Sequence, residues 1–458
     1  MGAVGFFFSM LAWSCSSSTN VPPETFNPGD ASILFHPDSG SDANLVDSTV
    51  NVTPDVGAPV DASDAAAAGD GACSPEAGAG ARACDGVCVN TLNDPKNCGG
   101  CGQQCDSLFA TGALCAKGNC ECGAPLVNCG QKCTDVTNDV DNCGLCGHGC
   151  QGAVCSSGLC APSPVTNAAA GVIMDLAIDA TSVYWTVAGA VYLKQFATPG
   201  SSPTVISPLS QVDPRGIAVD TTNVYWVDFA SGEVAYTQIL APASTPTVLV
   251  QPLLKDAGPS PDQPIDVAVD ANNVYWVDQG SGTVNEKPLR GGGAAIVLAT
   301  GRNHPIAVTF DSKFVYWADH GTTQTGTGSI NRVAIGQALG TVTPLATSQD
   351  QPEELTVDAT SVYWTNRSNS GTVNGVPVGG GIVAVLASNQ GGPHGVVVDS
   401  SWVYWTNYND NMVKKAPLTG GSTYTLATLQ HNPSAIAVDA KNVYWANQGD
   451  GSIWKVAK

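Results

Sequence analysis

One short pattern occurs seven times after residue 170 of this 458-residue chain, and it constrains the fold more than any other feature. In each copy an Asp stands six residues before the Trp of a Val-Tyr-Trp element, as in VAVDANNVYW at 267–276. The seven Asp–Trp pairs are Asp179 and Trp185, Asp220 and Trp226, Asp270 and Trp276, Asp311 and Trp317, Asp358 and Trp364, Asp399 and Trp405, and Asp439 and Trp445. Such self-similarity at a period of roughly 40–50 residues is typical of a repeat architecture.

Each copy divides into four short runs rich in β-branched and aromatic residues. In the third copy these are PIDVAVD, NVYWVD, TVNEKPL and AAIVLAT, separated by Asp, Asn and Gly turns. The pattern predicts four antiparallel strands per repeat, and no helical periodicity of useful length lies between them. Four-stranded units of this length bury their faces by closing radially. We therefore predict an all-β, seven-bladed β-propeller over residues 161–458.

The repeat resembles that of the YWTD propellers of low-density-lipoprotein-receptor type proteins. The resemblance rests on the YW[TVA][DN] segments and on P-x-x-IAVD before them, and it covers about residues 163 to 458. This chain departs from that family in having seven copies where the family has six. It also replaces the final Asp of the motif by Asn or, at Val187, by Val.

The repeated residues have structural roles in this interpretation. Tyr and Trp point to opposite faces of a strand, so each blade offers one large ring to each neighbour. The Asp accepts N–H groups of the following turn. The chain ends on a third strand, GSIWKVAK, and the missing fourth strand matches SPVTNAAAG before the first repeat. We expect residues near Pro164 to Ala168 to pair with Ile453 to Val456 and so close the ring.

Sixteen of the seventeen cysteines lie between Cys73 and Cys160. They fall into two units of eight with nearly the same spacing, which permits four disulfides in each unit. Units this small hold too little apolar core to fold unaided. We predict two tandem disulfide modules over 73–160, with zinc bound at NCGGCG and NCGLCG as the alternative. The segment CDGVCVNTLNDPKNCGGCGQQC resembles the tandem Cys-rich modules in surface proteins of predatory soil bacteria, which carry no known chemistry.

The first residues indicate export. GAVGFFFSMLAWSC is too short to span a bilayer and has the length of a signal peptide, assigned to residues 1–15. LAWSCSSST resembles the lipobox of bacterial lipoproteins, which implies acylation of Cys15; an ordinary secretory signal or a misplaced start codon are the alternatives. Residues 16–72 are acidic and rich in Ser, Pro, Ala and Asp, which predicts a disordered linker. The expected location is the cell envelope, as an outer-membrane lipoprotein, or the secreted fraction.

A net charge of -21 argues against sequence-independent electrostatic binding to the phosphates of DNA or RNA, so nucleic acid is not an expected partner. Candidate ligand-binding residues stand where the loops lead into the first strand of each blade. They occupy equivalent positions within two residues of Pro or Ile173 and should ring one mouth of the channel. These channel-mouth residues are Asp175, Arg215, Asp266, His304, Glu353, Glu354 and His394. As loop residues, Asp266 and Glu354 should be replaceable by Ala with loss of binding and little loss of stability.

Three functions compete. The favoured hypothesis is a surface binding module for a protein, peptide or glycan, which takes a small polar or cationic ligand or an exposed basic peptide at the channel mouth. No cofactor is expected, although Ca²⁺ becomes a ligand if three carboxylate oxygens reach one point. The second hypothesis is a metal-dependent lactonase or lyase, with Asp175, Asp266 and Glu354 converging and His394 as base or ligand. The third is a structural envelope protein. No Ser-His-Asp set, phosphate loop or HxxE-type metal motif favours catalysis.

Overall fold

The computed structural model describes residues 73, 79–108, 112–167, 171–207, 211–240, 245–251, 262–322, 324–368 and 370–458. The predicted signal segment, the predicted acylation site Cys15 and the predicted linker 16–72 lie outside the described residues. Within the described part, no helix is long and apolar enough to cross a membrane.

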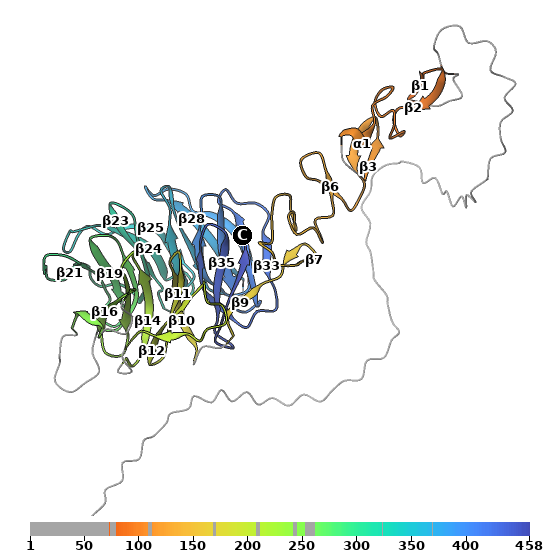
Figure 1. The fold of residues 1–458 in the computed structure, drawn as a ribbon. Helices are drawn as coiled ribbons and strands as arrows, with labels where there is room; N and C mark the ends of the chain where they lie inside the picture. Colours follow the sequence, from red (N-terminus) through yellow and green to blue (C-terminus); the bar gives the residue numbers. More distant parts are fainter. Residues whose placement is uncertain are drawn as a thin grey trace, which may run out of the picture. The chain divides into compact units, whose positions relative to one another are not determined.

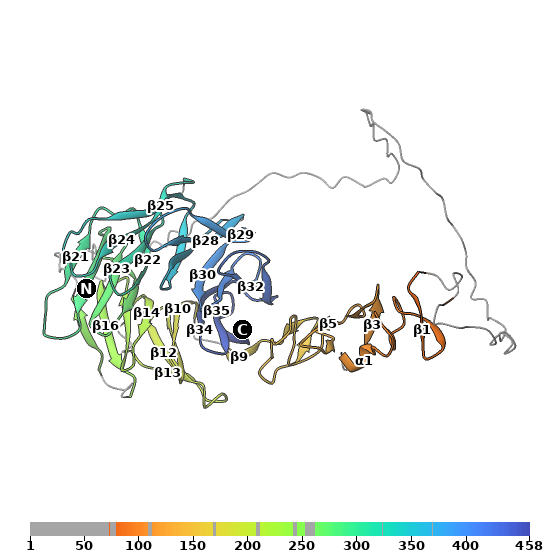
Figure 2. The ribbon, with the colours of Figure 1, turned by 90° about the horizontal axis from the view of Figure 1, so that it is seen from above.

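Residues 163–458 form a seven-bladed propeller of four-stranded antiparallel sheets, as predicted (Figures 1 and 2). In every blade each strand pairs with the strand named after it. The blades are β10 (Ile173–Ile178), β11 (Ser182–Val187), β12 (Ala190–Gln195) and β13 (Thr204–Val205); β14 (Pro214–Val219), β15 (Asn223–Asp228), β16 (Glu233–Gln238) and β17 (Thr247–Val250); β18 (Pro264–Val269), β19 (Asn273–Asp278), β20 (Thr283–Pro288) and β21 (Ile296–Ala299); β22 (Pro305–Phe310), β23 (Phe314–Asp319), β24 (Gly328–Ala334) and β25 (Thr343–Gln349); β26 (Pro352–Val357), β27 (Ser361–Asn366), β28 (Gly371–Pro377) and β29 (Ala384–Gln390); β30 (Pro393–Val398), β31 (Trp402–Asn407), β32 (Met412–Pro417) and β33 (Tyr424–Ala427); and β34 (Pro433–Val438), β35 (Asn442–Asn447), β36 (Ser452–Ala457) and β9 (Ser163–Thr166).

The ring is closed by a strand from before the first repeat. Strand β9 pairs antiparallel with β36 and supplies the fourth strand of blade 7, with Thr166 opposite Ile453 and Pro164 opposite Trp454. Both ribbon views show β9 beside the last blade (Figures 1 and 2). The first strands also contact one another in sequence around the axis, and β34 meets β10. The predicted closure is confirmed, and blade 7 leaves no unpaired edge at β36.

The Asp–Tyr–Trp motif holds the blades in two ways. The Asp carboxylate accepts the turn N–H groups and, in all seven blades, the hydroxyl hydrogen of the motif Tyr, at 2.7–3.0 Å. The Tyr of one blade and the Trp of the next share a core cluster, as Tyr275 and Trp317 do. The expected division of rings between neighbouring blades is therefore correct. The Tyr–Asp hydrogen bond was not predicted, although the constant spacing of five residues is its signature.

Where Asn replaces the final Asp of the motif, its side chain pairs with a Gln side chain of the same face. In blades 5 to 7 the Asn amide donates to a Gln side chain whose carbonyl also accepts the Trp indole N–H, as Gln390 does for Asn407 and Trp405. In blade 2 the Asp is retained, and Asp228 instead accepts the N–H groups of Val212 and Ser231. In both cases a side chain at the end of the second strand forms hydrogen bonds with the loop that leads into the first strand of a blade.

The sixteen cysteines from Cys73 to Cys160 form eight disulfides, and every pair stays inside one unit of eight. The pairs are Cys73–Cys88, Cys84–Cys101, Cys98–Cys115 and Cys105–Cys120 in the first unit, and Cys122–Cys133, Cys129–Cys146, Cys143–Cys155 and Cys150–Cys160 in the second. Short hairpins and one helical turn connect them: β1 (Ala81–Cys84), β2 (Val87–Asn90), α1 (Cys105–Leu108), β3 (Ala113–Ala116), β4 (Asn119–Cys122), β5 (Val127–Asn128), β6 (Cys133–Thr134), β7 (Cys155–Ser156) and β8 (Leu159–Cys160). The order of pairing is the same in both units, so the spacing repeat is also a connectivity repeat.

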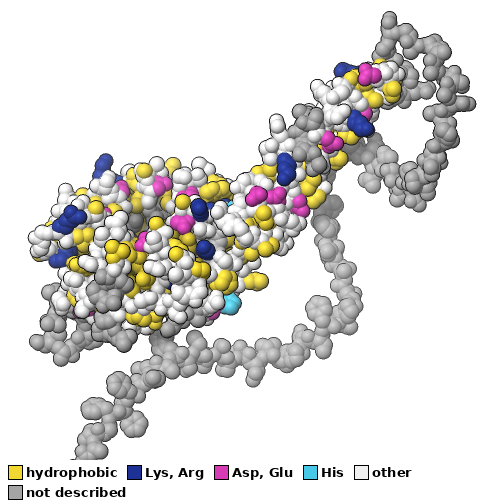
Figure 3. All heavy atoms as spheres, in the orientation of Figure 1, with side chains coloured by type: hydrophobic (Ala, Val, Ile, Leu, Met, Phe, Trp, Pro, Cys, Tyr) yellow, Lys and Arg dark blue, Asp and Glu magenta, His cyan; other side chains and the backbone are white. Residues whose placement is uncertain are grey.

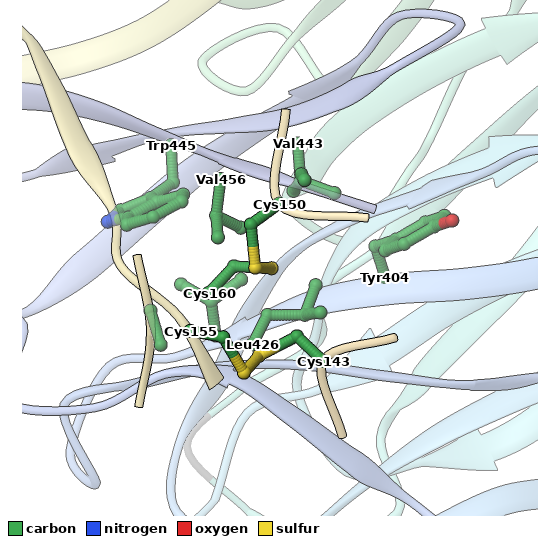
Figure 4. Close-up of a cluster of buried hydrophobic side chains, with 12 residues drawn as sticks. Cys143, Cys150, Cys155, Cys160, Tyr404, Leu426, Val443, Trp445 and Val456 are labelled. Carbon is green, nitrogen blue, oxygen red and sulfur yellow. A yellow bond between two sulfur atoms is a disulfide. The ribbon is translucent and has the colours of Figure 1, made fainter. Parts of the chain in front are cut away.

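The second disulfide unit packs against the propeller. The disulfides Cys143–Cys155 and Cys150–Cys160 lie in one apolar cluster with Leu426 of β33 and with Val443 and Val456 of blade 7 (Figure 4). Because β9 begins three residues after Cys160, this contact also fixes the start of the closing strand.

Charged side chains on the propeller are scattered. On the face drawn in Figure 3, Lys and Arg stand singly among hydrophobic and uncharged side chains.

Candidate functional site

A cavity of about 200 Å³ lies at the axis of the propeller, where the first strands converge. Each first strand has a bulge just after its leading Pro or Ile173, so that one or two of the residues that follow have no partner opposite them on the second strand. Bulges commonly re-aim side chains next to functional sites. The cavity is lined by Met174, Asp175, Arg215, Gly216, Ile265, Asp266, Ile306, Glu353, Glu354, His394, Ala435 and Gln448.

The structure brings six of the seven channel-mouth residues to this cavity, all except His304. His304 stands one residue before Pro305, is exposed and has a left-handed backbone with φ of 55°, and its ring contacts Asn303. It is one position outside the bulge that aims the other residues inward. The interpretation of these residues as loop residues is wrong for the six, which lie inside the first strands.

Three carboxyl groups occupy the second position after the leading residue in blades 1, 3 and 5. Asp175 accepts the N–H of Leu176 at 2.7 Å and that of Ile217, in the next blade, at 3.0 Å. Asp266 accepts the N–H of Val267 at 2.8 Å and that of Val308, in the next blade, at 2.7 Å. These carboxyls therefore join neighbouring first strands. Against the expectation from the sequence, the structure predicts a loss of stability when Asp266 is replaced by Ala, because two buried N–H groups would lose their acceptor.

The blades between them carry small residues at the same position. A Cβ on Gly216 would lie 2.5 Å from the Cα of Asp266 and 2.9 Å from the carbonyl oxygen of Ile265. The close approach of blades 2 and 3 therefore requires glycine at 216. This glycine also leaves the space at the axis to the three carboxyl groups.

Burial raises the pKa values of all three carboxyls, and the charges of neighbouring carboxyls add to this for Asp266 and Glu354. Burial raises the pKa of Asp175 to about 6, against the lowering effect of its two backbone hydrogen bonds. Burial and the nearby Asp175 raise the pKa of Asp266 to about 8. The pKa of Glu354 lies well above its ordinary value because of burial and then the charges of Asp266 and Asp175. Within the described residues, none of the three has a Lys, Arg or His partner.

A second cluster surrounds Glu353, the first residue after Pro352. Its carboxylate lies 2.8 Å from Arg367 Nη1, 3.2 Å from His394 Nε2 and 3.7 Å from His320 Nε2. The other ring nitrogen of His394, Nδ1, is buried without a hydrogen-bond partner among the described residues. Burial lowers the pKa of His394, and Glu353 opposes this while Arg367 adds to it. The charge of Glu353 is thus balanced by Arg367, and the lowered pKa of His394 favours an uncharged imidazole.

Arg215, the one basic channel-mouth residue besides the two histidines, is also engaged. Its guanidinium donates to Asp213 at 2.8 Å and lies 4.1 Å from the ring centroid of Phe229. It therefore does not neutralise the three axial carboxyls.

The sequence interpretation missed the apolar part of the cavity. Met174, Ile265 and Ile306 stand at the first position after the leading residue, where the polar Arg215 and Glu353 stand in their own blades. The position of these three residues, one after the leading Pro or Ile173, can be read from the sequence, but their side chains are apolar and do not indicate a binding role. The cavity thus combines carboxyls with an aliphatic wall.

The geometry does not assemble a metal site. Among the described residues, the only groups of three His, Cys, Asp or Glu side chains with ligand atoms within 4.8 Å of one another are disulfide-bonded cysteines, Cys98, Cys105 and Cys120, and Cys143, Cys150 and Cys160. The axial carboxyls are therefore farther apart than the oxygen ligands of a single Ca²⁺.

No protein-family model matches the sequence, and no curated protein matches it either. Solved structures are similar in fold. Virginiamycin B lyase from Staphylococcus aureus superposes with a TM-score of 0.52 at 11% identity, over 65% of this chain and 98% of that one. A catalytically inactive variant of that enzyme, solved with quinupristin, gives 0.52 at 12% over the same shares. The WD40 β-propeller domain of Doa1 gives 0.50 at 11%, over 65% and 97%. At these identities the similarity shows the propeller fold and no more.

Together, the blades and the cystines place the chain among seven-bladed β-propellers that follow a disulfide-rich region. Eight disulfides are typical of proteins in an extracellular or otherwise oxidising compartment.

Proposed function

We propose that the propeller is a binding module that holds an organic cation, an ammonium or guanidinium group, in its axial cavity. The observation that carries the proposal is the convergence of Asp175, Asp266 and Glu354 on one cavity without a basic partner among the described residues. Carboxyls gathered in this way repel one another when ionised, and a bound cation relieves that repulsion. The oxygens of these carboxyls keep free lone pairs beyond their backbone hydrogen bonds.

An organic cation suits the cavity better than Ca²⁺. The carboxyls are too widely spaced for one metal ion, and the side chains of Ile265 and Ile306 offer an apolar surface to the carbon chain of an amine. A Lys or Arg side chain presented by a protein or peptide has this combination of charge and aliphatic stem.

Titration calorimetry of the full chain with cadaverine, and with a peptide containing a single Lys, tests the proposal. The isosteric double variant Asp266→Asn and Glu354→Gln should bind at least tenfold more weakly, because two of the three carboxyls that can ionise beside the bound cation are removed. Glu233→Gln is the matched control on the same face, outside the cavity, and should bind like the wild type. Wild-type-like binding by the double variant, or no binding of either probe by the wild type, would contradict the proposal.

The setting of the module is part of the same proposal. The chain is an exported surface protein with a YWTD-type propeller, anchored through acylated Cys15 and spaced from the membrane by residues 16–72 in the cell envelope. The partner is a protein or peptide, or a glycan that carries an amino group. Supporting this are the disulfides, the YW[TVA][DN] repeats and the lipobox-like LAWSC segment.

A lyase is the second candidate, and it rests on one observation. His394 has a buried, unpartnered Nδ1 and a carboxylate, Glu353, at its other nitrogen, which is the arrangement of an oriented base. Incubation with quinupristin, followed by mass spectrometry, separates the two candidates. Conversion by the wild type that is lost in His394→Ala would establish the lyase, whereas unchanged quinupristin is the result that the binding proposal predicts.

A further inference from the structure

Lys415 is a buried lysine whose charge has no partner of opposite sign in contact. It lies on β32 opposite Tyr404 and Tyr424, and only 4% of its surface is exposed. Its Nζ lies 4.6 Å from the ring centroid of Trp402. Among the described residues, that ammonium makes no hydrogen bond or ion pair, and the nearby Asp399 pairs with Lys458 instead.

At the same register position, blades 3 and 4 carry charged side chains that form hydrogen bonds with the backbone of the next blade. Glu286, opposite the motif Tyr of blade 3, accepts the N–H of Gly336 at 2.7 Å. Arg332, its counterpart in blade 4, donates to the carbonyl oxygen of Val378. Both charged groups thus use the backbone of the following blade, whereas Lys415 does not. A buried charge without such a partner is costly unless something else neutralises it.

The ammonium of Lys415 faces the space between blade 6 and the second disulfide unit. One cavity there has a volume of about 310 Å³ and is lined by Lys415, Lys458, His148, Trp402, Tyr404 and Ser401 among others. A second cavity of about 370 Å³, also lined by Lys415 and His148, lies against Leu426 and the backbone around Gly144. Lys415 therefore stands where the two cavities meet.

The acidic group in this region is already engaged. Asp399 lies 2.7 Å from Lys458 Nζ and accepts the hydroxyl hydrogen of Tyr404 at 2.8 Å and the N–H of Trp402 at 2.9 Å. It does not come within ion-pair distance of Lys415. The cavity is left with one uncompensated positive charge beside two aromatic rings.

We propose that this cavity binds a small organic carboxylate, with Lys415 as its counter-ion and the ring of Trp402 beside its apolar part. The site is separate from the axial cavity, and it exists only because the disulfide unit covers β32. The hydroxyl of Ser401 supplies a further polar group at the cavity, whereas the ring nitrogens of His148 face the carbonyl oxygens of Cys143 and Ala457. An aromatic carboxylate such as benzoate matches both the charge and the rings.

The lowered pKa of Lys415 is consistent with a role as counter-ion for a bound carboxylate. Burial lowers its pKa to about 8, Asp399 acts in the opposite direction, and Lys458 lowers it further. A carboxylate bound beside the ammonium must raise that pKa again, since an opposite charge favours the charged form.

Titration calorimetry of the full chain with benzoate tests the site. We expect saturable binding that Lys415→Met weakens at least tenfold, while Lys414→Met, the adjacent lysine on the same strand, binds like the wild type. Equal binding by Lys415→Met, or no saturable binding by the wild type, would overturn the proposal.

A second measurement keeps the test independent of whether Lys415→Met folds. The Lys415 Nζ resonance of the wild type, followed by NMR against pH, should show a higher pKa with benzoate than without it. A pKa that stays the same at saturating benzoate would equally refute the site.

Discussion

Two carboxyl residues of blade 5, four positions apart in the chain, have opposite roles. Burial alone would raise the pKa of Asp358, but hydrogen bonds from Thr360, Ser361 and Tyr363 lower it overall. The Glu354 carboxyl accepts one backbone hydrogen bond, from the N–H of Leu355, and its pKa is raised by burial and by the axial carboxyls. The turn carboxylate is thus a structural anion, while the axial carboxyl lies among like charges whose repulsion a bound cation would relieve.

This difference predicts how stability depends on pH. In the folded chain, the pKa values of Asp175 and Asp266 are about 6 and about 8, above the values expected when unfolded. Their contribution is therefore fully present below about pH 4 and is lost as pH rises through 6 to 8. Asp266→Asn should reduce the loss of melting temperature between pH 5 and pH 9, measured by calorimetry. An unchanged pH profile in the variant would show that Asp266 titrates normally.

Among the strands, β9 and β36 determine whether the ring holds. Their pairing was predictable because the chain ends on a third strand and its missing fourth strand precedes the first repeat. The bulges in the first strands were not predictable in the same way. An offset of one residue, such as that between Pro264 and Asp266, leaves no mark in the pattern of residue types. That is why the sequence pattern alone suggests loops where the structure has strands.

The closing pair gives a stability prediction. Ile453 on β36 is fully buried in the cluster that joins blade 7 to blade 1. Ile453→Ala should lower the free energy of unfolding by about 2–5 kcal/mol, because it creates a cavity at the closure. Ile382→Ala, at a position that is 90% exposed, is the control and should change it by less than about 0.5 kcal/mol. Denaturant unfolding measures both, and equal effects would place the closure outside the cooperative unit.

In the molecule as a whole, the propeller and the second disulfide unit share a core. The sequence predicted both parts, and the shared spacing predicted two disulfide units. It did not predict their contact, because Leu426 and Val443 look like ordinary strand residues and the exposed side of a cystine has no sequence signature. The Lys415 cavity was missed for the same reason, since it arises only where the two parts meet.

The candidate site at the axis was predictable in position but not in chemistry. The equivalent positions after each Pro located six of its residues. Which of them lack partners depends on contacts between blades, such as that of His394 with Glu353, and these follow from the three-dimensional register.

If the axial carboxyls form a site for an organic cation, a crystal structure of the full chain with cadaverine will reveal it. We expect an ammonium group in the axial cavity within hydrogen-bond distance of Asp266 or Glu354, with the carbon chain along Ile265 or Ile306. Cadaverine bound elsewhere, with the axial cavity holding only water, would show that the carboxyls do not bind cations.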